Sequence, residues 1–433
     1  MFFLSGCKTP GILYRSNNIE LIEIKPSEVL LRSSASNVDI TEILNKYLND
    51  SSIKTFRISD GQFLISKHIR VARDSITILG SRKTVIKSSF PNLQQYNLMF
   101  LNESHDPSGT LNSIVYKSLI FDASNFGFLV INQFNRVKNI EVSNCQFLNG
   151  GNTFPDNSNN TSMWTNALAC SNKCSGIISN NRVLNMTKTG IYIAGGNEQM
   201  IVADNYIDMN NNGFGRPGIL ALKNTIVYGN EISNCSGAGI LLQSIEPTDL
   251  LVSLGIDVRP YNIKVFRNKI NKCFTGIEFN HFPGYDTNIS IRQGLDPRLS
   301  NSVIEDNVIT NVVQTGIMIV NRKGIKIRNN NIRNEENNPS ISGITILGSE
   351  DIEVTQNYID NVYQNIFFIE NVSKITISGN KANVSLISPI YELEMRSTDY
   401  TSQEIYYKSN SFKSTAFTNT TFYSLKNSMV ERN

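Results

Sequence analysis

Apolar and polar residues alternate in short runs along most of the chain, and glycine or asparagine interrupts the runs at similar intervals. The stretch 218–242 contains one complete unit, in which Gly-Ile-Leu-Ala opens the first run and Ile226-Val227 lies in the second. Ile232 lies in the third run, and Gly239 opens the next unit. Alternation with period two predicts strands that point their side chains inward and outward in turn. The unit therefore predicts a coil of three short strands.

From residue 113 the repeat reads I-x-V/I-x-x-N-x-I, then a variable turn, then G-I-x-I. Where it is regular, its asparagine returns every 23 to 27 residues. Asparagine tolerates left-handed backbone angles, and stacked amides can bond to both neighbours, so we interpret this column as structural. We assign to it Ser118, Cys145, Asn181, Asn205, Asn230, Asn268, Asn307, Asn330, Asn357, Asn380 and Asn410.

A length of 433 residues favours about three domains, but an internal period overrides that expectation because solenoids grow along one axis. Ile and Val suit a stacked interior, and coils would lie about 4.8 Å apart. Residues 38–50 read as a short amphipathic helix, with Asp39 as its cap and Ile40, Ile43 and Leu44 among its apolar positions. Such a helix is expected to cover the exposed end of the first coil.

The first coils carry D-G-x-F at Asp60–Phe63, I-x-V at Ile69–Val71, S-I-T-I-x-G at Ser75–Gly80 and T-x-I at Thr84–Ile86. With the later repeats, these segments resemble the pectate-lyase-like, right-handed parallel β-helix superfamily. The G-A-x-G-D-G segment that many phage tailspikes and plant-type polygalacturonases of this superfamily carry before the cap helix is absent. The resemblance implies an all-β fold, a right-handed parallel β-helix of about a dozen three-stranded coils with an N-terminal cap helix.

We expect three regions along the chain. Residues 1–37 form an N-terminal segment and spacer, residues 38–412 form the β-helix, and residues 413–433 form a tail or C-terminal cap. Three longer gaps between repeats predict loop insertions, and loops on a rigid scaffold often carry function. The insertions are 150–165, 244–260 and 280–300.

The composition limits the classes of partner that the protein is expected to bind. Hydrophobic residues make up 40% and charged residues 18% of the chain, which suits a long core. A net charge of +3 argues against nucleic-acid binding. The sequence has no run of 18 apolar residues, so it predicts no membrane-spanning helix.

The cysteines raise three separate questions. Leu4-Ser5-Gly6-Cys7 resembles a bacterial lipobox, in which Cys7 would be lipidated, although too few residues precede it for a signal peptide. Cys235 and Cys273 each follow a column asparagine by five residues, so they should stack as a disulfide or, as we favour, as two packed thiols. Cys170 and Cys174 lack further ligands, so zinc is not expected.

In related enzymes the outward face of the G-I strands commonly forms the floor of a saccharide groove. Here that face should be mostly apolar, with a single charge, and loops or a partner chain should cover it. It comprises Tyr192, Leu220, Leu241, Glu278, Met318, Thr345 and Phe367.

Ionisable residues are densest at the third insertion, where the candidate catalytic residues are Glu278, His281, Asp286, Arg292, Asp296 and Arg298. A glycosidase needs two carboxyls, which Glu278 with Asp286 or Asp296 could supply. A lyase needs a base and a cation, which His281 with Arg292 or Arg298 could supply, or calcium in place of the cation. The alternative is a solvated loop whose charges pair with one another.

The candidate substrate-binding residues are Tyr192, Arg216, Lys223, Trp164 and Tyr285. Tyr192, Arg216 and Lys223, with Asp208, form a second cluster on the two preceding coils. The alternative is that they are ordinary surface charges. The sequence favours an exported protein of the bacterial envelope or the extracellular space that cleaves or modifies an acidic polysaccharide, as a lyase or hydrolase. The alternative is a non-catalytic glycan-binding, adhesion or tailspike-like protein. We expect a monomer or homotrimer, no fixed metal site, and a membrane only through the lipid anchor.

Overall fold

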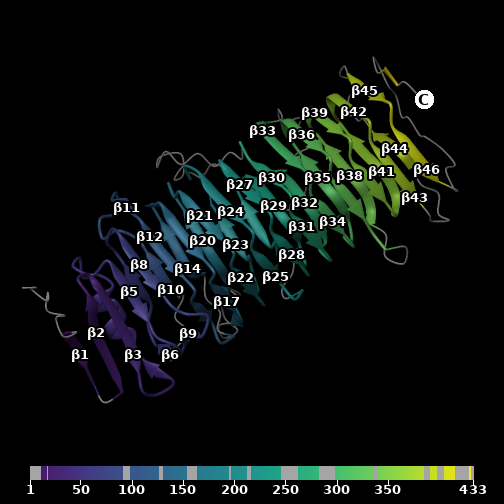
Figure 1. Ribbon diagram of the computed structural model, residues 1–433. Coiled ribbons are helices and arrows are strands. Elements are labelled where there is room, and N and C mark those ends of the chain that lie inside the picture. The colour runs from purple at the N-terminus through teal and green to yellow at the C-terminus, as the bar shows by residue number, and fades with distance from the viewer. Residues whose placement is uncertain are drawn as a thin grey trace, which may run out of the picture.

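The computed structural model describes residues 11–16, 18–90, 98–125, 130–153, 163–194, 197–211, 216–244, 262–281, 298–335, 340–384, 391–396, 404–414 and 429–430. In these residues the chain winds into an elongated stack of coils with three long sheets (Figure 1). Neighbouring coils pair through parallel strands, as the sequence predicts.

Sheet 1 contains the first strand of each coil. Its strands are β3 (Glu28–Ser33), β5 (Thr55–Ile58), β8 (Ile76–Leu79), β12 (Ile114–Lys117), β16 (Ile140–Ser143), β21 (Gly176–Ser179), β24 (Met200–Ala203), β27 (Thr225–Tyr228), β30 (Lys264–Phe266), β33 (Arg298–Glu305), β36 (Arg322–Arg328), β39 (Glu350–Thr355), β42 (Ser373–Ser378) and β45 (Ile405–Lys408), with β1 (Gly11–Arg15), β2 (Ile19–Lys25) and β47 (Met429–Val430) at its ends.

Sheet 2 contains the second strand of each coil. Its strands are β4 (Val38–Asp39), β6 (Gly61–Ile65), β9 (Thr84–Ser88), β13 (Ile120–Asp122), β17 (Gln146–Leu148), β22 (Arg182–Leu184), β25 (Tyr206–Asp208), β28 (Glu231–Ser233), β31 (Lys269–Asn271), β34 (Val308–Thr310), β37 (Asn331–Arg333), β40 (Tyr358–Asp360), β43 (Lys381–Val384) and β46 (Ser411–Ser414).

Sheet 3 closes each coil. Its strands are β7 (Ile69–Val71), β10 (Leu98–Asn102), β14 (Val130–Asn135), β20 (Asn166–Ser171), β23 (Ile191–Ile193), β26 (Ile219–Ala221), β29 (Ala238–Ser244), β32 (Thr275–His281), β35 (Thr315–Val320), β38 (Ser340–Leu347), β41 (Val362–Glu370) and β44 (Tyr391–Arg396). Among the described residues, the 12 strands of sheet 3 correspond to 12 three-stranded coils, which confirms the expected fold class. Two short pairs, β11 (Leu111–Asn112) with β15 (Val137–Lys138) and β18 (Asn152–Thr153) with β19 (Met163–Trp164), lie beside these sheets.

The asparagine column forms a continuous chain of hydrogen bonds at the turn between sheets 1 and 2. Each side-chain amide from Asn181 to Asn380 donates to the side-chain oxygen of the next column residue at 2.9–3.0 Å, ending at Asn410. The same oxygen also accepts the backbone N–H of the preceding column residue, as between Asn330 and Asn357. The column is therefore structural, as interpreted from the sequence.

Two details of the column differ from the prediction. The left-handed backbone lies one residue earlier, at positions such as Asn180, Asp204 and Arg267, because the column amide itself must face the interior. Ser118 occupies this left-handed position, since Lys117 pairs with Ser143, so Leu119 stands in the column where Ser118 was expected.

The glycines of the G-I motif permit close packing at the turn into sheet 3. A methyl group added at Gly276 would lie 2.3 Å from the carbonyl oxygen of Gly316 and 2.6 Å from Cγ2 of Ile309. Both distances are far below van der Waals contact, and a methyl group at the equivalent glycines of the neighbouring coils would cause the same steric clash. The motif therefore reflects the sharp corner between sheets 2 and 3.

The N-terminal region differs from the expected spacer. β1, β2 and β3 form an antiparallel meander, and β3 then pairs in parallel with β5. Ile19, Leu21, Val29 and Leu31 are buried by this pairing, so residues 11–33 extend sheet 1 instead of forming a spacer. The sequence does not predict this meander, because residues 11–33 lack the column asparagine of the later coils.

The cap helix α1 (Thr41–Tyr47) takes the place of a sheet 3 strand in the first coil, and its predicted apolar positions are buried. The helix is shorter than the predicted range 38–50, and Ile40, not Asp39, is its N-cap, because Val38–Asp39 form β4. Asp39 still accepts a hydrogen bond from the backbone N–H of Thr41 at 2.9 Å. The amides of Asn45 and Asn49 form hydrogen bonds with the backbone of Arg70 in β7 and of His68 and Ala72 on either side of it. Helix positions four apart rise about 6 Å and match strand residues two apart, so these amides satisfy the edge of sheet 3.

The structure describes the two cysteines that the sequence predicts to stack. Cys235 and Cys273 lie in register on neighbouring coils, and both are free and buried, which confirms packed thiols over a disulfide. Burial, and then the neighbouring Cys273 thiol, raises the pKa of Cys235. Cys7 lies outside the described residues. No helix in the described ranges is long and apolar enough to cross a membrane.

The asparagine column yields a stability prediction at Asn330, whose side chain takes part in five hydrogen bonds. We expect Asn330→Ala to lower the free energy of unfolding by about 3 kcal/mol or more, because several buried groups lose their partners. Asn331→Ala, on the outward side of the adjacent position, should change it by no more than about 0.5 kcal/mol. Urea denaturation of both variants measures the difference, and equal losses would contradict a structural column.

Candidate functional site

The outward face of sheet 3 forms one aligned row of side chains. Strand register places Tyr192, Leu220, Leu241, Glu278, Met318 and Thr345 side by side on successive coils, as the sequence predicts. Phe367 does not belong to this row. β41 is irregular in register, so Thr345 pairs with Phe368, and Phe367 points into the core, where it is fully buried.

Glu278 is the only charged residue among those six, and it lies between Leu241 and Met318. Burial raises the pKa of its carboxyl group, although a hydrogen bond from the Asn280 amide at 2.6 Å opposes the shift. A carboxyl group in an apolar row that keeps its proton can act as a general acid.

Arg322 supports the strand segment that carries Glu278. Its side chain is fully buried, it donates a hydrogen bond to the carbonyl oxygen of Asn280, and its guanidinium lies 5.1 Å from the centre of the Phe279 ring. Because Asn280 in turn donates to Glu278, the buried arginine orients the carboxyl group through one intermediate residue. Arg322 begins β36, in a turn whose sequence Asn-Arg-Lys-Gly reads as exposed.

Two cations lie on neighbouring coils at the start of the sheet 3 strands. Lys188 and Arg216 each precede a paired residue, Ile191 and Ile219, by three positions. Burial and then the positive charge of Arg216 lower the pKa of Lys188, so the two side chains lie close enough to repel. Arg216 is on the coil two places before Glu278, about 10 Å along the axis.

Adjacent cations bind an anion such as a carboxylate well, because the anion removes their mutual repulsion. The sequence analysis selected Arg216 and missed Lys188. Counting back from the glycines Gly190 and Gly218 aligns the two residues, so the signal was present in the repeat itself.

The other predicted residues are not all brought together. Tyr192 lies in the outward row, and burial raises its pKa. Lys223 follows β26 at the opposite end of the strand from Arg216, and Asp208 lies on sheet 2. The four residues are therefore not gathered at one place, because the coil carries Asp208 and Tyr192 on different sheets. The substrate-binding roles of Tyr192, Arg216 and Lys223 stay predictions.

For the third insertion the structure describes only the ends. His281 ends β32 and pairs with Ser244, and Arg298 begins β33 and pairs with Arg322. Asp286, Arg292, Asp296 and Tyr285 lie outside the described residues. Trp164 of the first insertion lies in β19 and pairs with Asn152.

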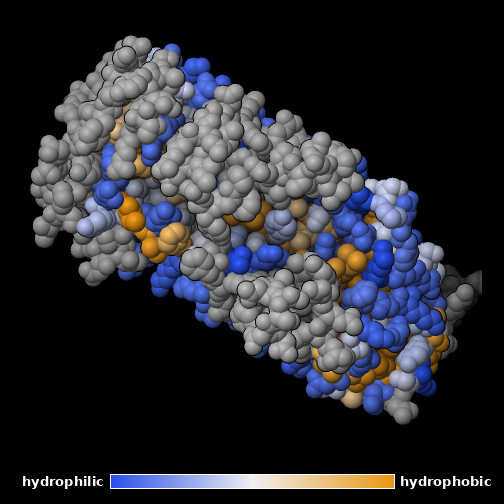
Figure 2. Space-filling view, turned by 180° about the vertical axis from the view of Figure 1, so that it is seen from behind, coloured by the Kyte–Doolittle hydropathy of each residue, from blue (hydrophilic) through white to orange (hydrophobic). Residues whose placement is uncertain are grey.

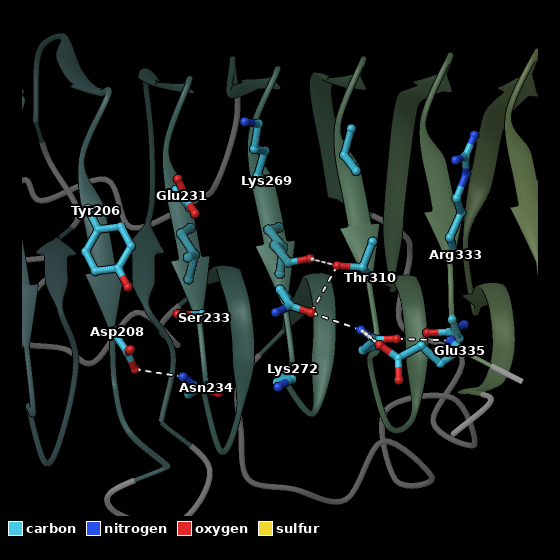
Figure 3. Close-up of a pocket in the computed structure, with 16 residues that line it drawn as sticks. Tyr206, Asp208, Glu231, Ser233, Asn234, Lys269, Lys272, Thr310, Arg333 and Glu335 are labelled. Atoms are coloured by element: carbon cyan, nitrogen blue, oxygen red, sulfur yellow. Dashed lines mark hydrogen bonds between the residues drawn. The ribbon is translucent and has the colours of Figure 1, made fainter. Parts of the chain in front are cut away.

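Sheet 2 carries a hollow that the sequence analysis did not anticipate. An open cavity of about 630 Å³ extends over β25, β28, β31, β34 and β37 (Figure 3). Tyr206, Glu231, Lys269 and Arg333 are among the residues that line it. On the side opposite to the view of Figure 1, the described surface is mostly hydrophilic, with hydrophobic residues in separate patches (Figure 2). Neither sheet has three or more metal-ligating side chains gathered among its described residues.

This architecture defines a right-handed parallel β-helix protein with polar and apolar outward faces. The chain belongs to the family described as "Right handed beta helix region", whose model matches residues 149–293 and 255–391, together more than half of the chain. The predicted relationship to pectate-lyase-like β-helix proteins is thereby confirmed. No curated protein sequence matches this chain.

Solved structures share the fold at low sequence identity. A mutant tailspike protein of E. coli bacteriophage HK620 in complex with pentasaccharide has a TM-score of 0.59 and 12% identity, covering 94% of this chain and 82% of that chain. The surface adhesin PfbA of Streptococcus pneumoniae has a TM-score of 0.56 and 12% identity, covering 84% and 89%. The A-module of the Azotobacter vinelandii mannuronan C-5 epimerase AlgE4 has a TM-score of 0.54 and 11% identity, covering 92% and 97%. At this identity the likeness concerns the fold.

The raised pKa of Glu278 predicts how stability depends on pH. The folded protein binds this proton more tightly than the unfolded chain, so ionisation costs folding free energy as the pH rises above about 4.5. We expect Glu278→Gln to be more stable than the native protein at pH 7, with the advantage disappearing below about pH 4. Thermal melts across this pH range measure the difference.

Glu231→Gln serves as the matched control for that series, because Glu231 is exposed to solvent. Its melting temperatures should follow those of the native protein at every pH. If Glu278→Gln also follows them, the carboxyl group of Glu278 does not have the environment described above.

Proposed function

We propose that the protein is a carbohydrate-active β-helix protein that cleaves or modifies an acidic polysaccharide along the outward face of sheet 3. The observation that carries the proposal is the pairing of two features on this face. Glu278 has a raised pKa within an apolar row, and Arg216 and Lys188 lie two and three coils away from it. A uronate polymer that runs along the helix axis would meet both groups.

The proposed site has a carboxylate-binding part and a proton-donating part. Lys188 and Arg216 would bind a uronate carboxylate, and their position near Tyr192 and Leu220 provides an apolar surface for the sugar ring. Glu278, whose pKa is raised by burial, would donate a proton to a leaving-group oxygen, and Asn280 and Arg322 would hold its carboxyl group in place. For a hydrolase, Asp286 or Asp296 at the third insertion would supply the second carboxyl group. For a lyase, His281 would be the base, and Arg292, Arg298 or calcium would neutralise the uronate carboxylate.

Non-catalytic glycan binding is the second candidate function. The outward row of sheet 3 is mostly apolar, with one carboxyl group among six positions, which suits the stacking of sugar rings more than it suits acid–base chemistry. The related structures include a surface adhesin as well as an epimerase and a tailspike. Trp164, Tyr285 and Lys223 would then contribute only contacts with the glycan.

The activity is tested with a panel of polygalacturonate, alginate and chondroitin. Lyase activity would appear as absorbance at roughly 235 nm, from the unsaturated uronate left by proton abstraction, and hydrolysis would appear as new reducing ends. We expect Glu278→Gln to lower kcat by about 100-fold or more, because a general acid contributes at least that factor. Arg216→Ala should chiefly raise KM.

The matched control is Glu353→Gln on sheet 1, where the carboxylate pairs with Lys326 at 3.6 Å. It should leave both kinetic constants unchanged. Full activity of Glu278→Gln would reject the proposed site, whereas binding without any product would favour the adhesin-like alternative.

A polysaccharide substrate places the protein outside the cytoplasm, either on the cell envelope or free in the medium. A lipid anchor at Cys7 would account for envelope attachment, and the protein would act as a monomer or a homotrimer. We expect the N-terminal peptide from the native host to begin at an acylated Cys7, as measured by mass spectrometry. A peptide with an unmodified Met1 or a free Cys7 would exclude the anchor and leave the sheet 3 proposal intact.

A further inference from the structure

The hollow on sheet 2 is built from aligned rows of outward side chains. One row runs through Tyr206, Glu231, Lys269 and Val308 on successive coils. The five coils of the hollow span about 19 Å along the helix axis, at one strand spacing per coil. An extended ligand could therefore contact several coils at once. This face is separate from the sheet 3 row, which lies on a different side of each coil (Figure 1).

The charged side chains of the hollow are not paired as they are elsewhere. On sheet 1, outward charges on neighbouring coils form ion pairs, such as Lys117 with Glu141 at 2.8 Å and Arg328 with Glu305 at 2.6 Å. Glu231 and Lys269 are also direct neighbours in register. Among the described residues, however, neither these two side chains nor Lys272 forms an ion pair or a side-chain hydrogen bond, so their charges face solvent and are available to a ligand.

The floor of the hollow is a row of amides and hydroxyls that hold one another in place (Figure 3). Asn234 donates to Asp208 at 2.9 Å, and the Asn271 side-chain oxygen accepts from Thr310 at 3.1 Å and from Asn311 at 3.2 Å. Within the described part of the chain, the N–H groups of the Asn271 amide have no acceptor. Fixed donors and acceptors at one strand spacing suit a ligand that carries many hydroxyl groups.

The charge balance of the hollow narrows the class of ligand. Lys269, Lys272 and Arg333 are offset by Asp208, Glu231 and Glu335. A densely charged polyanion would be repelled by these carboxylates, so the face does not suit a nucleic acid or a polyuronate. Tyr206 adds an aromatic surface at one end, where the guanidinium of Arg182 lies 5.4 Å from its ring centre. A sugar ring can pack its apolar side against such a surface.

We propose that the sheet 2 hollow is a second glycan-binding site, which takes a neutral or sparsely charged oligosaccharide lying along the helix axis. The sugar hydroxyls bond to the amides, carboxylates and lysines of the floor, and one ring stacks on Tyr206. The site does not depend on the sheet 3 proposal, because it shares no residue with it. A protein with both sites would hold one stretch of a heteropolysaccharide while acting on another.

The test is calorimetric titration of the full chain with neutral hexasaccharides of glucose, galactose, mannose and N-acetylglucosamine, and with oligogalacturonate hexamers as acidic probes. We expect at least one neutral hexamer to bind. Tyr206→Ala and the double variant Lys269→Ala/Asn271→Ala should each weaken it by about tenfold or more, since each removes a stacking surface or two polar contacts. Thermal melts and circular dichroism show whether each variant is folded.

Controls separate this site from the rest of the surface. Lys381→Ala, farther along the same row of sheet 2, and Tyr406→Ala, exposed on sheet 1, should leave the affinity unchanged. Glu278→Gln and Arg216→Ala should also leave binding of the neutral hexamer unchanged. The proposal is overturned if no neutral hexamer binds, or if the Tyr206 and Lys269/Asn271 variants of the hollow bind it as tightly as the native protein. Loss of neutral-hexamer binding in the sheet 3 variants would also overturn it.

Discussion

Every coil of this protein must match its neighbours at the spacing of one hydrogen-bonded strand, about 4.8 Å. The asparagine column shows the constraint most directly, because each amide has to satisfy the residue before it, the residue after it and two or three backbone groups. Asn268, for example, donates to Val227, Phe266 and Asn307, and accepts from Asn230. A residue of another length at this position would leave buried N–H and carbonyl groups without partners, and such groups cost about 1–3 kcal/mol each.

The same constraint determines how the stack begins. A parallel sheet has an exposed edge at its first strand, and that edge can pair with another chain. In this protein a different element lies at the first edge of each sheet. The β1–β3 meander extends sheet 1, β4 begins sheet 2, and helix α1 covers sheet 3, where Asn45 and Asn49 replace the missing neighbour of β7. At the other end, β47 pairs with β45, so two residues of the tail lie along the last strand of sheet 1.

Because the interior and the turns hold the coils together, the outward faces are free to differ. Sheet 1 pairs several of its outward charges between neighbouring coils, as with Lys326 and Glu353. Sheet 3 presents an apolar row that contains Glu278, whose pKa is raised by burial. Sheet 2 presents Glu231 and Lys269 without partners in the described structure. Burying a carboxyl group costs stability, so the face that retains one is a face on which a function is expected.

The sequence by itself determined the solenoid, its number of coils, the asparagine column, the cap helix and most of the sheet 3 row. These features repeat along the chain, and period-two alternation identifies inward and outward positions without coordinates. Only the tertiary structure decided which side chains meet across coils. The asparagine column contains Leu119 where Ser118 was predicted, and Phe368, not Phe367, pairs with Thr345 of the sheet 3 row. Arg322 is buried. Lys188 lies close to Arg216. The first three depend on register shifts and turn lengths between distant segments, which a local pattern does not encode, whereas the alignment of Lys188 with Arg216 could be counted from the repeat.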